Sequence, residues 1–99
     1  MIEYLYDAIR ATAGERIELS AIIEKAEGEP ITEMCHIMLF DKDNVELLAT
    51  YDGTFIEELG LWNFTIPGEA TKGKLGRYWY RICTPEASLC FKQPIYFCV

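Results

Sequence analysis

The stretch that decides the fold is residues 76–83, which reads Gly76-Arg77-Tyr78-Trp79-Tyr80-Arg81-Ile82-Cys83. Successive side chains of a β-strand point to opposite faces of a sheet, so this stretch predicts a strand with two unlike surfaces. The even-numbered residues from Tyr78 to Ile82 are aromatic or aliphatic, and we expect them to face a core. The odd-numbered residues from Arg77 to Cys83 mix cations with a tryptophan, and we expect them to face away from it.

The flanking segments extend this reading on both sides. Residues 84–88 predict a turn, and residues 89–99 predict the last strand of a hairpin. If Ile82 lies opposite Phe91, then Cys83 lies opposite Cys90 on the outer side, close enough to be bridged on oxidation. Further strands are expected at residues 17–23, 34–40, 45–51 and 62–66. Asp52-Gly53 predicts a turn between two of them.

About seven strands in 99 residues, with turn signals every 8 to 12 residues, predict an immunoglobulin-like antiparallel β-sandwich. We expect one domain over residues 1–99. Residues 3–12 could form an edge strand or a short amphipathic helix, and the strand is favoured. Residues 69–74 are the only interior stretch with helical character.

Composition narrows the function classes. A hydrophobic content of 51% with 13% aromatic residues is that of a folded domain, and a net charge of −7 argues against general affinity for nucleic acid. The acidic residues Glu3 and Asp7 interrupt any secretory signal, and no apolar run is long enough to span a membrane. We therefore expect the chain to be made and folded in a cytosol.

A family resemblance rests on three short motifs within residues 60–84. They are Trp62-Asn63-Phe64-Thr65-Ile66-Pro67, Ala70-Thr71-Lys72-Gly73 and Leu75-Gly76-Arg77-Tyr78-Trp79-Tyr80-Arg81-Ile82. This hairpin resembles that of small immunoglobulin-like proteins of tailed phages and prophages, and is similar to the N-terminal sandwich domain of phage baseplate upper proteins. The resemblance implies an accessory structural protein, made in the bacterial cytoplasm and incorporated into a phage particle. It implies no catalytic residue, and we expect this chain to differ from the baseplate proteins in having no C-terminal extension beyond the sandwich.

The residues themselves predict no catalytic, cofactor-binding or metal-binding site, and we expect no enzyme. His36 is the single histidine, so a thiol–imidazole dyad would need Cys83 or Cys90 across the sheet. A zinc site would add Cys98, but the C-x2–4-C spacing of structural zinc sites does not occur. The pairs Asp41/Asp43 and Glu57/Glu58 are explained more simply as solvated turn residues. In a reducing compartment all four cysteines, Cys35 included, are expected to be thiols.

Two tyrosines and several large side chains are assigned structural roles. Tyr78 occupies the position near the start of a strand where sandwich domains place a corner tyrosine, whose hydroxyl bonds to backbone across the corner. No cysteine pair is placed to join the two sheets as in antibody domains. The core must therefore be filled by side-chain bulk, supplied by Trp62, Phe64, Tyr80, Ile82 and Phe91.

The odd-numbered face predicts the function. Together with the last strand it forms a candidate interaction face made of Arg77, Trp79, Arg81, Lys92 and Tyr96. Strand 34–40 is apolar on both sides and would add to this face either His36, Met38 and Phe40 or the alternating set from Cys35 to Leu39. Tryptophan, tyrosine and arginine are enriched at the centres of protein interfaces.

We therefore expect a protein–protein interaction module that binds a second copy of the chain or another virion component, and neither nucleic acid nor membrane. Two alternatives stay open at this point. The first is that the N-terminal strand or a loop of the same chain covers this face. The second is a carbohydrate-binding sandwich in which Trp79 and Tyr96 stack on sugar rings.

Overall fold

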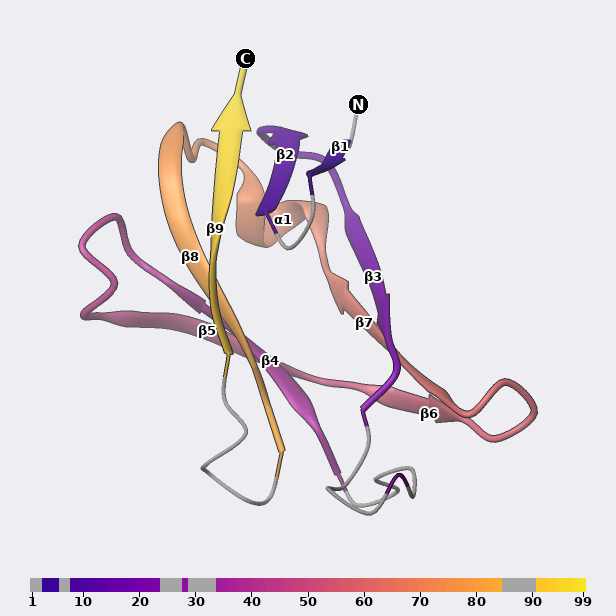
Figure 1. The fold of residues 1–99 in the computed structure, drawn as a ribbon. Coiled ribbons are helices and arrows are strands. Elements are labelled where there is room, and N and C mark those ends of the chain that lie inside the picture. Colours follow the sequence, from indigo (N-terminus) through magenta and orange to yellow (C-terminus); the bar gives the residue numbers. More distant parts are fainter. Residues whose placement is uncertain (1–2, 6–7, 24–27, 29–33, 85–90) are drawn as a thin grey trace.

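The computed structural model describes residues 3–5, 8–23, 28, 34–84 and 91–99, and these form two packed β-sheets with one short helix (Figure 1). The side chains of residues 3–5, 91 and 92 lie outside the description. The strands are β1 (Glu3–Leu5), β2 (Ala8–Thr12), β3 (Ile17–Ala21), β4 (His36–Phe40), β5 (Leu47–Asp52), β6 (Thr54–Ile56), β7 (Leu61–Ile66), β8 (Gly76–Cys83) and β9 (Phe91–Cys98).

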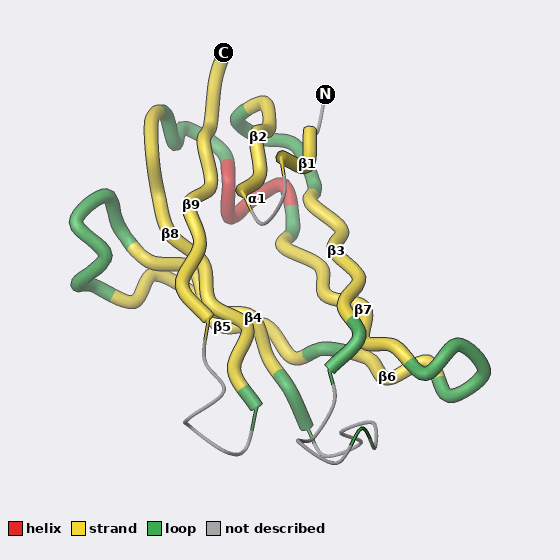
Figure 2. The backbone as a smooth tube through the Cα atoms, viewed as in Figure 1, coloured by secondary structure: helices red, strands yellow, loops and turns green. Residues whose placement is uncertain are grey.

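The strand order is that of an immunoglobulin-like sandwich, which confirms the predicted fold class. One sheet has the order β1-β2-β9-β8-β4-β5, and the other has the order β3-β7-β6. The central β4, β8 and β9 correspond to the C, F and G strands of such domains, with β3, β7 and β6 as the opposing B, E and D strands. Figure 2 shows the two layers of strands facing each other, and the side chains of the core lie between them. The N-terminal segment forms strands, as favoured, rather than a helix.

One pairing departs from the purely antiparallel sheet that was predicted. β2 runs parallel to β9, with Ile9 opposite Ile95 and Thr12 opposite Cys98. The turn after β2 then carries the chain to the other sheet, where β3 begins at Ile17. β2 therefore adds a strand beside β9 in the six-stranded sheet, while β3 belongs to the opposite, three-stranded sheet.

Inside the sandwich, the alternation of β8 has the predicted sense. Tyr80 is buried in the core, and Tyr78 and Ile82 pack against it. The opposite layer contributes Trp62 and Phe64, whose rings stack with centroids 6.3 Å apart. No disulfide joins the sheets among the described residues, so aromatic bulk fills the position that a disulfide occupies in antibody domains. The side chain of Phe91, also assigned to the core, lies outside the description.

Gly53 does not make the predicted turn, and this is a correction. The chain continues in extended form from β5 through Gly53 into β6, a strand that the sequence did not suggest. Gly53 is buried, and its N–H donates a 2.8 Å hydrogen bond to the Cys35 carbonyl. A Cβ placed here would lie 2.5 Å from the Phe64 ring. Glycine is therefore required by the close approach of an aromatic side chain as the chain passes between the sheets.

Within the described residues the helix is α1 (Gly68–Thr71), which overlaps the stretch 69–74 that was expected to have helical character. Its buried Thr71 hydroxyl accepts a 3.0 Å hydrogen bond from the Gly14 N–H and lies 2.9 Å from the Glu15 carbonyl oxygen, to which it can donate. These contacts tie α1 to the turn between β2 and β3. In the described part of the chain, no helix has the length and apolar character needed to cross a bilayer.

Candidate interaction face

The register between β8 and β9 brings together the residues predicted for the interaction face. Arg77 lies opposite Tyr96, Trp79 opposite Pro94, and Arg81 opposite Lys92. Ile82 lies opposite Phe91, as expected. Arg77 and Tyr96 are exposed, while Trp79 and Arg81 are half-buried. The Lys92 side chain lies outside the described part, so only its backbone position on this face is known.

The structure decides which side of β4 joins this face. Cys35, Ile37 and Leu39 are buried in the core. His36, Met38 and Phe40 alternate with them and therefore point to the outer side. Their partners across the β4–β8 ladder are Cys83, Arg81 and Trp79, respectively. We call the outer surface of β4, β8 and β9 the outer face; its described side chains are His36, Met38, Phe40, Arg77, Trp79, Arg81, Cys83, Pro94 and Tyr96.

The two cations of β8 are placed over aromatic rings. The Arg77 guanidinium lies 5.3 Å from the centroid of the Trp79 ring, and that of Arg81 lies 4.9 Å from the centroid of Phe40. Phe40 is only 8% exposed although it belongs to the outer side, because Arg81 lies over it. Cation–π contacts of this kind hold the guanidinium groups flat against the sheet.

Neither guanidinium is neutralised by an acidic side chain of the described residues. The ion pair that forms among these residues joins Arg16, just before β3, to Glu18 on β3, and none involves Arg77 or Arg81. The Nε atom of Arg81 is buried and has no hydrogen-bond acceptor within the described part of the chain. A guanidinium prefers a planar carboxylate acceptor, so the described part of this face lacks the chemical group that best complements it.

The orientation of Trp79 depends on a residue that the sequence did not single out. The Trp79 indole Nε1–H donates a 3.3 Å hydrogen bond to the Lys42 carbonyl in the β4–β5 loop. This loop is held by Asp41, whose carboxylate accepts hydrogen bonds from the N–H groups of Val45 and Glu46. Asp41 is therefore a turn-capping residue, as its position suggested.

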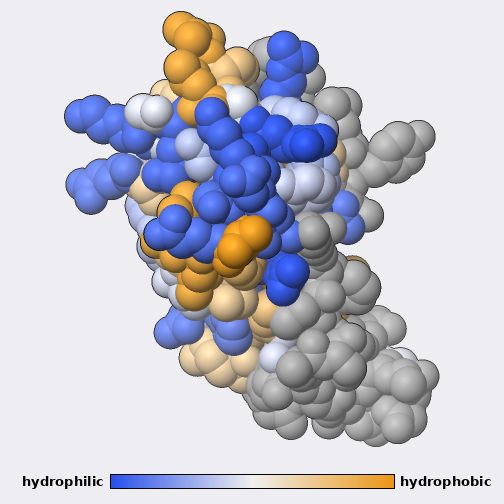
Figure 3. All heavy atoms as spheres, turned by 90° about the vertical axis from the view of Figure 1, so that its left-hand side faces the viewer, coloured by the Kyte–Doolittle hydropathy of each residue, from blue (hydrophilic) through white to orange (hydrophobic). Residues whose placement is uncertain are grey.

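The N-terminal strands lie beside the outer face and do not cover it. β2 pairs edge to edge with β9 and places Arg10, which is exposed, opposite Tyr96. This adds a cation that the sequence reasoning did not assign to the face. Figure 3 shows the side of the molecule at the left of Figure 1, where hydrophilic side chains surround separate hydrophobic patches (Figure 3).

Cys83 is half of a disulfide, whereas Cys35 and Cys98 are thiols. The expected neighbour of Cys83, Cys90, lies outside the described residues. The Cys83 sulfur is 3.4 Å from the Met38 sulfur. A sulfur in a disulfide is neither a thiolate nucleophile nor a zinc ligand. While it is disulfide-bonded, Cys83 can therefore neither form a catalytic dyad with His36 nor bind zinc together with it. No group of three potential metal ligands occurs in the described part of the chain.

The Tyr78 ring packs edge-on against Phe97 with centroids 5.5 Å apart, and the Lys42 ammonium lies 5.8 Å from its centroid. The hydrogen bonds within the described structure do not include one from the Tyr78 hydroxyl, so the predicted corner bond is not seen there. The contacts found for Tyr78 are those of a ring at the edge of the core.

Comparisons with protein-family models, with curated proteins and with solved structures found no match for this chain. Its function is therefore argued from the geometry of its surfaces.

Proposed function

We propose that this protein is a non-enzymatic protein–protein interaction module that binds through its outer face, and that its simplest partner is a second copy of the chain. The observation that carries the proposal is the pair of cations Arg77 and Arg81, which flank Trp79 and have no acidic partner in the described structure. An acidic patch of a neighbouring subunit would supply the missing carboxylates.

The character of the surrounding surface supports the same function. A sheet face that contacts water normally alternates to polar residues. Here the neighbours are Met38, Pro94 and Tyr96, of which Tyr96 is 40% exposed, while Phe40 is buried with Arg81 over its ring. Aromatic residues, methionine and arginine are the residue types enriched at protein interfaces. β2 extends the sheet sideways and leaves this surface without a covering strand from the described chain.

A carbohydrate platform has less support. Sugar rings stack on an open aromatic face, but the Arg77 guanidinium already lies over Trp79 and the indole N–H is bonded to Lys42. A sugar would have to displace the guanidinium or use the remaining part of the ring. The biological setting that we propose, an accessory structural protein of a phage or prophage, rests on the resemblance of residues 60–84.

The test is light scattering on a size-exclusion column, at two concentrations and with reductant. We expect the wild-type chain to form an oligomer and Trp79→Ser to release folded monomers. Arg77→Ala should weaken association, whereas the matched control Arg16→Ala, just before β3, should not, because Arg16 already pairs with Glu18 at 2.7 Å. An oligomer that persists unchanged in Trp79→Ser would contradict the proposal.

A further inference from the structure

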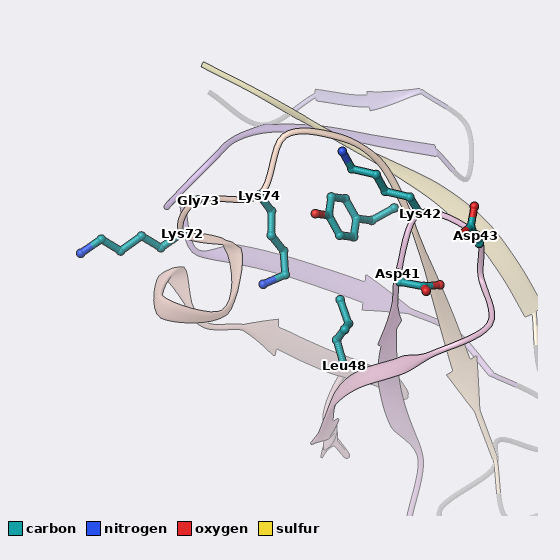
Figure 4. Close-up of a pocket in the computed structure, with 8 residues that line it drawn as sticks. Asp41, Lys42, Asp43, Leu48, Lys72, Gly73 and Lys74 are labelled. Carbon is teal, nitrogen blue, oxygen red and sulfur yellow. The ribbon is translucent and has the colours of Figure 1, made fainter.

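A second surface, apart from the outer face, gathers lysines at one corner of the sandwich. Lys42 from the β4–β5 loop and Lys72 and Lys74 from the segment after α1 line an open depression of about 500 Å³. Leu48 and Tyr78 also line it, and Figure 4 shows Leu48 near the end of the Lys74 side chain. We call this the lysine depression. Three lysines in one place are notable in a chain of net charge −7.

The lysines are not neutralised within the described structure. None of them belongs to an ion pair among the described residues. Asp41 and Asp43 also line the depression, but the Asp41 carboxylate is used by backbone N–H groups of its own loop. Figure 4 shows both carboxylates on the side away from Lys72 and Lys74, with Lys74 extending toward Leu48 and Lys72 projecting from the rim.

The apolar part of the depression narrows the class of ligand. Leu48 is 40% exposed, and the Tyr78 ring is half-buried. A ligand that satisfies both parts needs two or more negative charges next to an apolar group. A short peptide segment with adjacent carboxylates and one aliphatic side chain has this chemistry.

The chain itself carries such a segment at its opposite end. The turn between β6 and β7 presents Glu57, Glu58 and Leu59, all exposed, with Leu59 66% exposed. The turn is well defined, because the Gly60 N–H lies 2.9 Å from the Ile56 carbonyl oxygen. Figure 1 shows this turn projecting at the far right, away from α1 and the start of β8. We call residues 57–59 the acidic turn.

We propose that the acidic turn of one copy docks in the lysine depression of the next, with Glu57 and Glu58 facing the lysines and Leu59 contacting Leu48. The two surfaces lie at different ends of one molecule, so the contact is head-to-tail and joins copies in a row or a ring. This contact does not use the outer face, so it stands or fails independently of the function proposed above.

Charge reversal tests the pairing. We expect Lys72→Glu with Lys74→Glu, and separately Glu57→Lys with Glu58→Lys, each to weaken self-association at least tenfold in sedimentation velocity. Combining all four changes in one chain, or mixing the two double variants, should restore association. The control Glu18→Lys, at an exposed position of β3 in the other sheet, raises the net charge as much as one of the two changes at the acidic turn but should leave association intact.

A direct measurement on the wild-type chain removes any dependence on variants that fold poorly. A carbodiimide joins a lysine amine to a carboxylate as an amide, with loss of water. In a mixture of ¹⁵N-labelled and unlabelled chains, we expect mixed-label crosslinks between residues 72–74 and residues 57–58. Association without these crosslinks would overturn the inference, as would association that the charge reversals leave unchanged.

The other possible outcomes also test the docking of the acidic turn. A chain that stays monomeric while inorganic phosphate shifts the NMR signals of these lysines would overturn the docking in favour of a small-anion site. If charge reversal has no effect but Trp79→Ser releases monomers, the head-to-tail contact fails and the outer-face function stands. The opposite pattern supports the contact and contradicts the outer-face function.

Discussion

The two faces of β8 carry alternate residues of one strand, yet they are in opposite physical states. On the inner face, Tyr80 is 4% exposed and packs among aromatic and aliphatic side chains from both sheets. On the outer face, Arg77 lies over the Trp79 ring and Trp79 bonds to the β4–β5 loop, but no second layer of the described chain lies over them. Inner-face residues should therefore govern stability, and outer-face residues should govern association.

The largest expected effect comes from emptying the inner side. Phe64 is 1% exposed, its ring stacks with that of Trp62, and the backbone of Gly53 lies close to it. Phe64→Ala should lower the free energy of unfolding by about 4 kcal/mol, because it removes buried apolar surface and leaves a cavity. Urea unfolding followed by tryptophan fluorescence measures this. A loss below about 1 kcal/mol would show that the inner face is less tightly packed than the structure indicates.

The opposite change, overfilling the same region, should have a somewhat smaller effect. Gly53→Ala places a methyl group 2.5 Å from the Phe64 ring and 2.9 Å from the Trp62 ring, so these rings or the backbone must move. We expect a loss of about 2 to 3 kcal/mol. The neighbouring Thr54→Ala, at an exposed position, is the matched control and should change stability by less than about 0.5 kcal/mol.

A buried hydrogen bond near the end of the sandwich should rank third. Thr71→Val keeps the side-chain volume but removes the acceptor for the Gly14 N–H and the contact with the Glu15 carbonyl. Losing these two buried contacts should cost about 1 to 2 kcal/mol in the free energy of unfolding. Thr71→Ser, which retains the hydroxyl, should recover most of the loss. Equal losses in both variants would assign the effect to packing instead.

The smallest effect on stability is expected on the outer face, and it sharpens the comparison. Arg77→Ala removes an exposed side chain whose described contact is with the Trp79 ring. The free energy of unfolding should therefore change by less than about 1 kcal/mol. The same variant should weaken association measurably in light scattering. A large loss of stability without a change in association would place Arg77 in the structural class and remove the distinction between the two faces.

Several features of the fold follow directly from local sequence. The alternation in residues 76–83 predicted the inner and outer sides of β8, and the pairing of Ile82 with Phe91 predicted the register of the last hairpin. Both succeed because the period of two in a strand is a local property, and because hairpin register is set by a turn of few residues. The half-buried strand at residues 17–23 was recognised for the same reason, and it forms β3 (Ile17–Ala21).

Other features depended on contacts between distant residues. β6 has only three residues and no alternation of apolar and polar side chains, so no local pattern predicts it. Asp52-Gly53 has the sequence of a turn, and only the position of the Phe64 ring beside Gly53 explains the glycine. Strand 34–40 is apolar on both sides, so only its packing showed that His36, Met38 and Phe40 face outward. The hydrogen bond from Trp79 to the Lys42 carbonyl joins residues 37 positions apart, and no sequence pattern predicts it.

The sequence by itself determined the all-β class, most strand positions and the two unlike faces of β8, because these follow from local periodicity and turn chemistry. Only the tertiary structure decided that β2 runs parallel to β9, that Gly53 joins the two sheets, and that Lys42, Lys72 and Lys74 meet around Tyr78. Those arrangements depend on how two layers pack across a shared core. Packing brings residues from distant parts of the chain into contact, and a local sequence pattern does not predict such contacts.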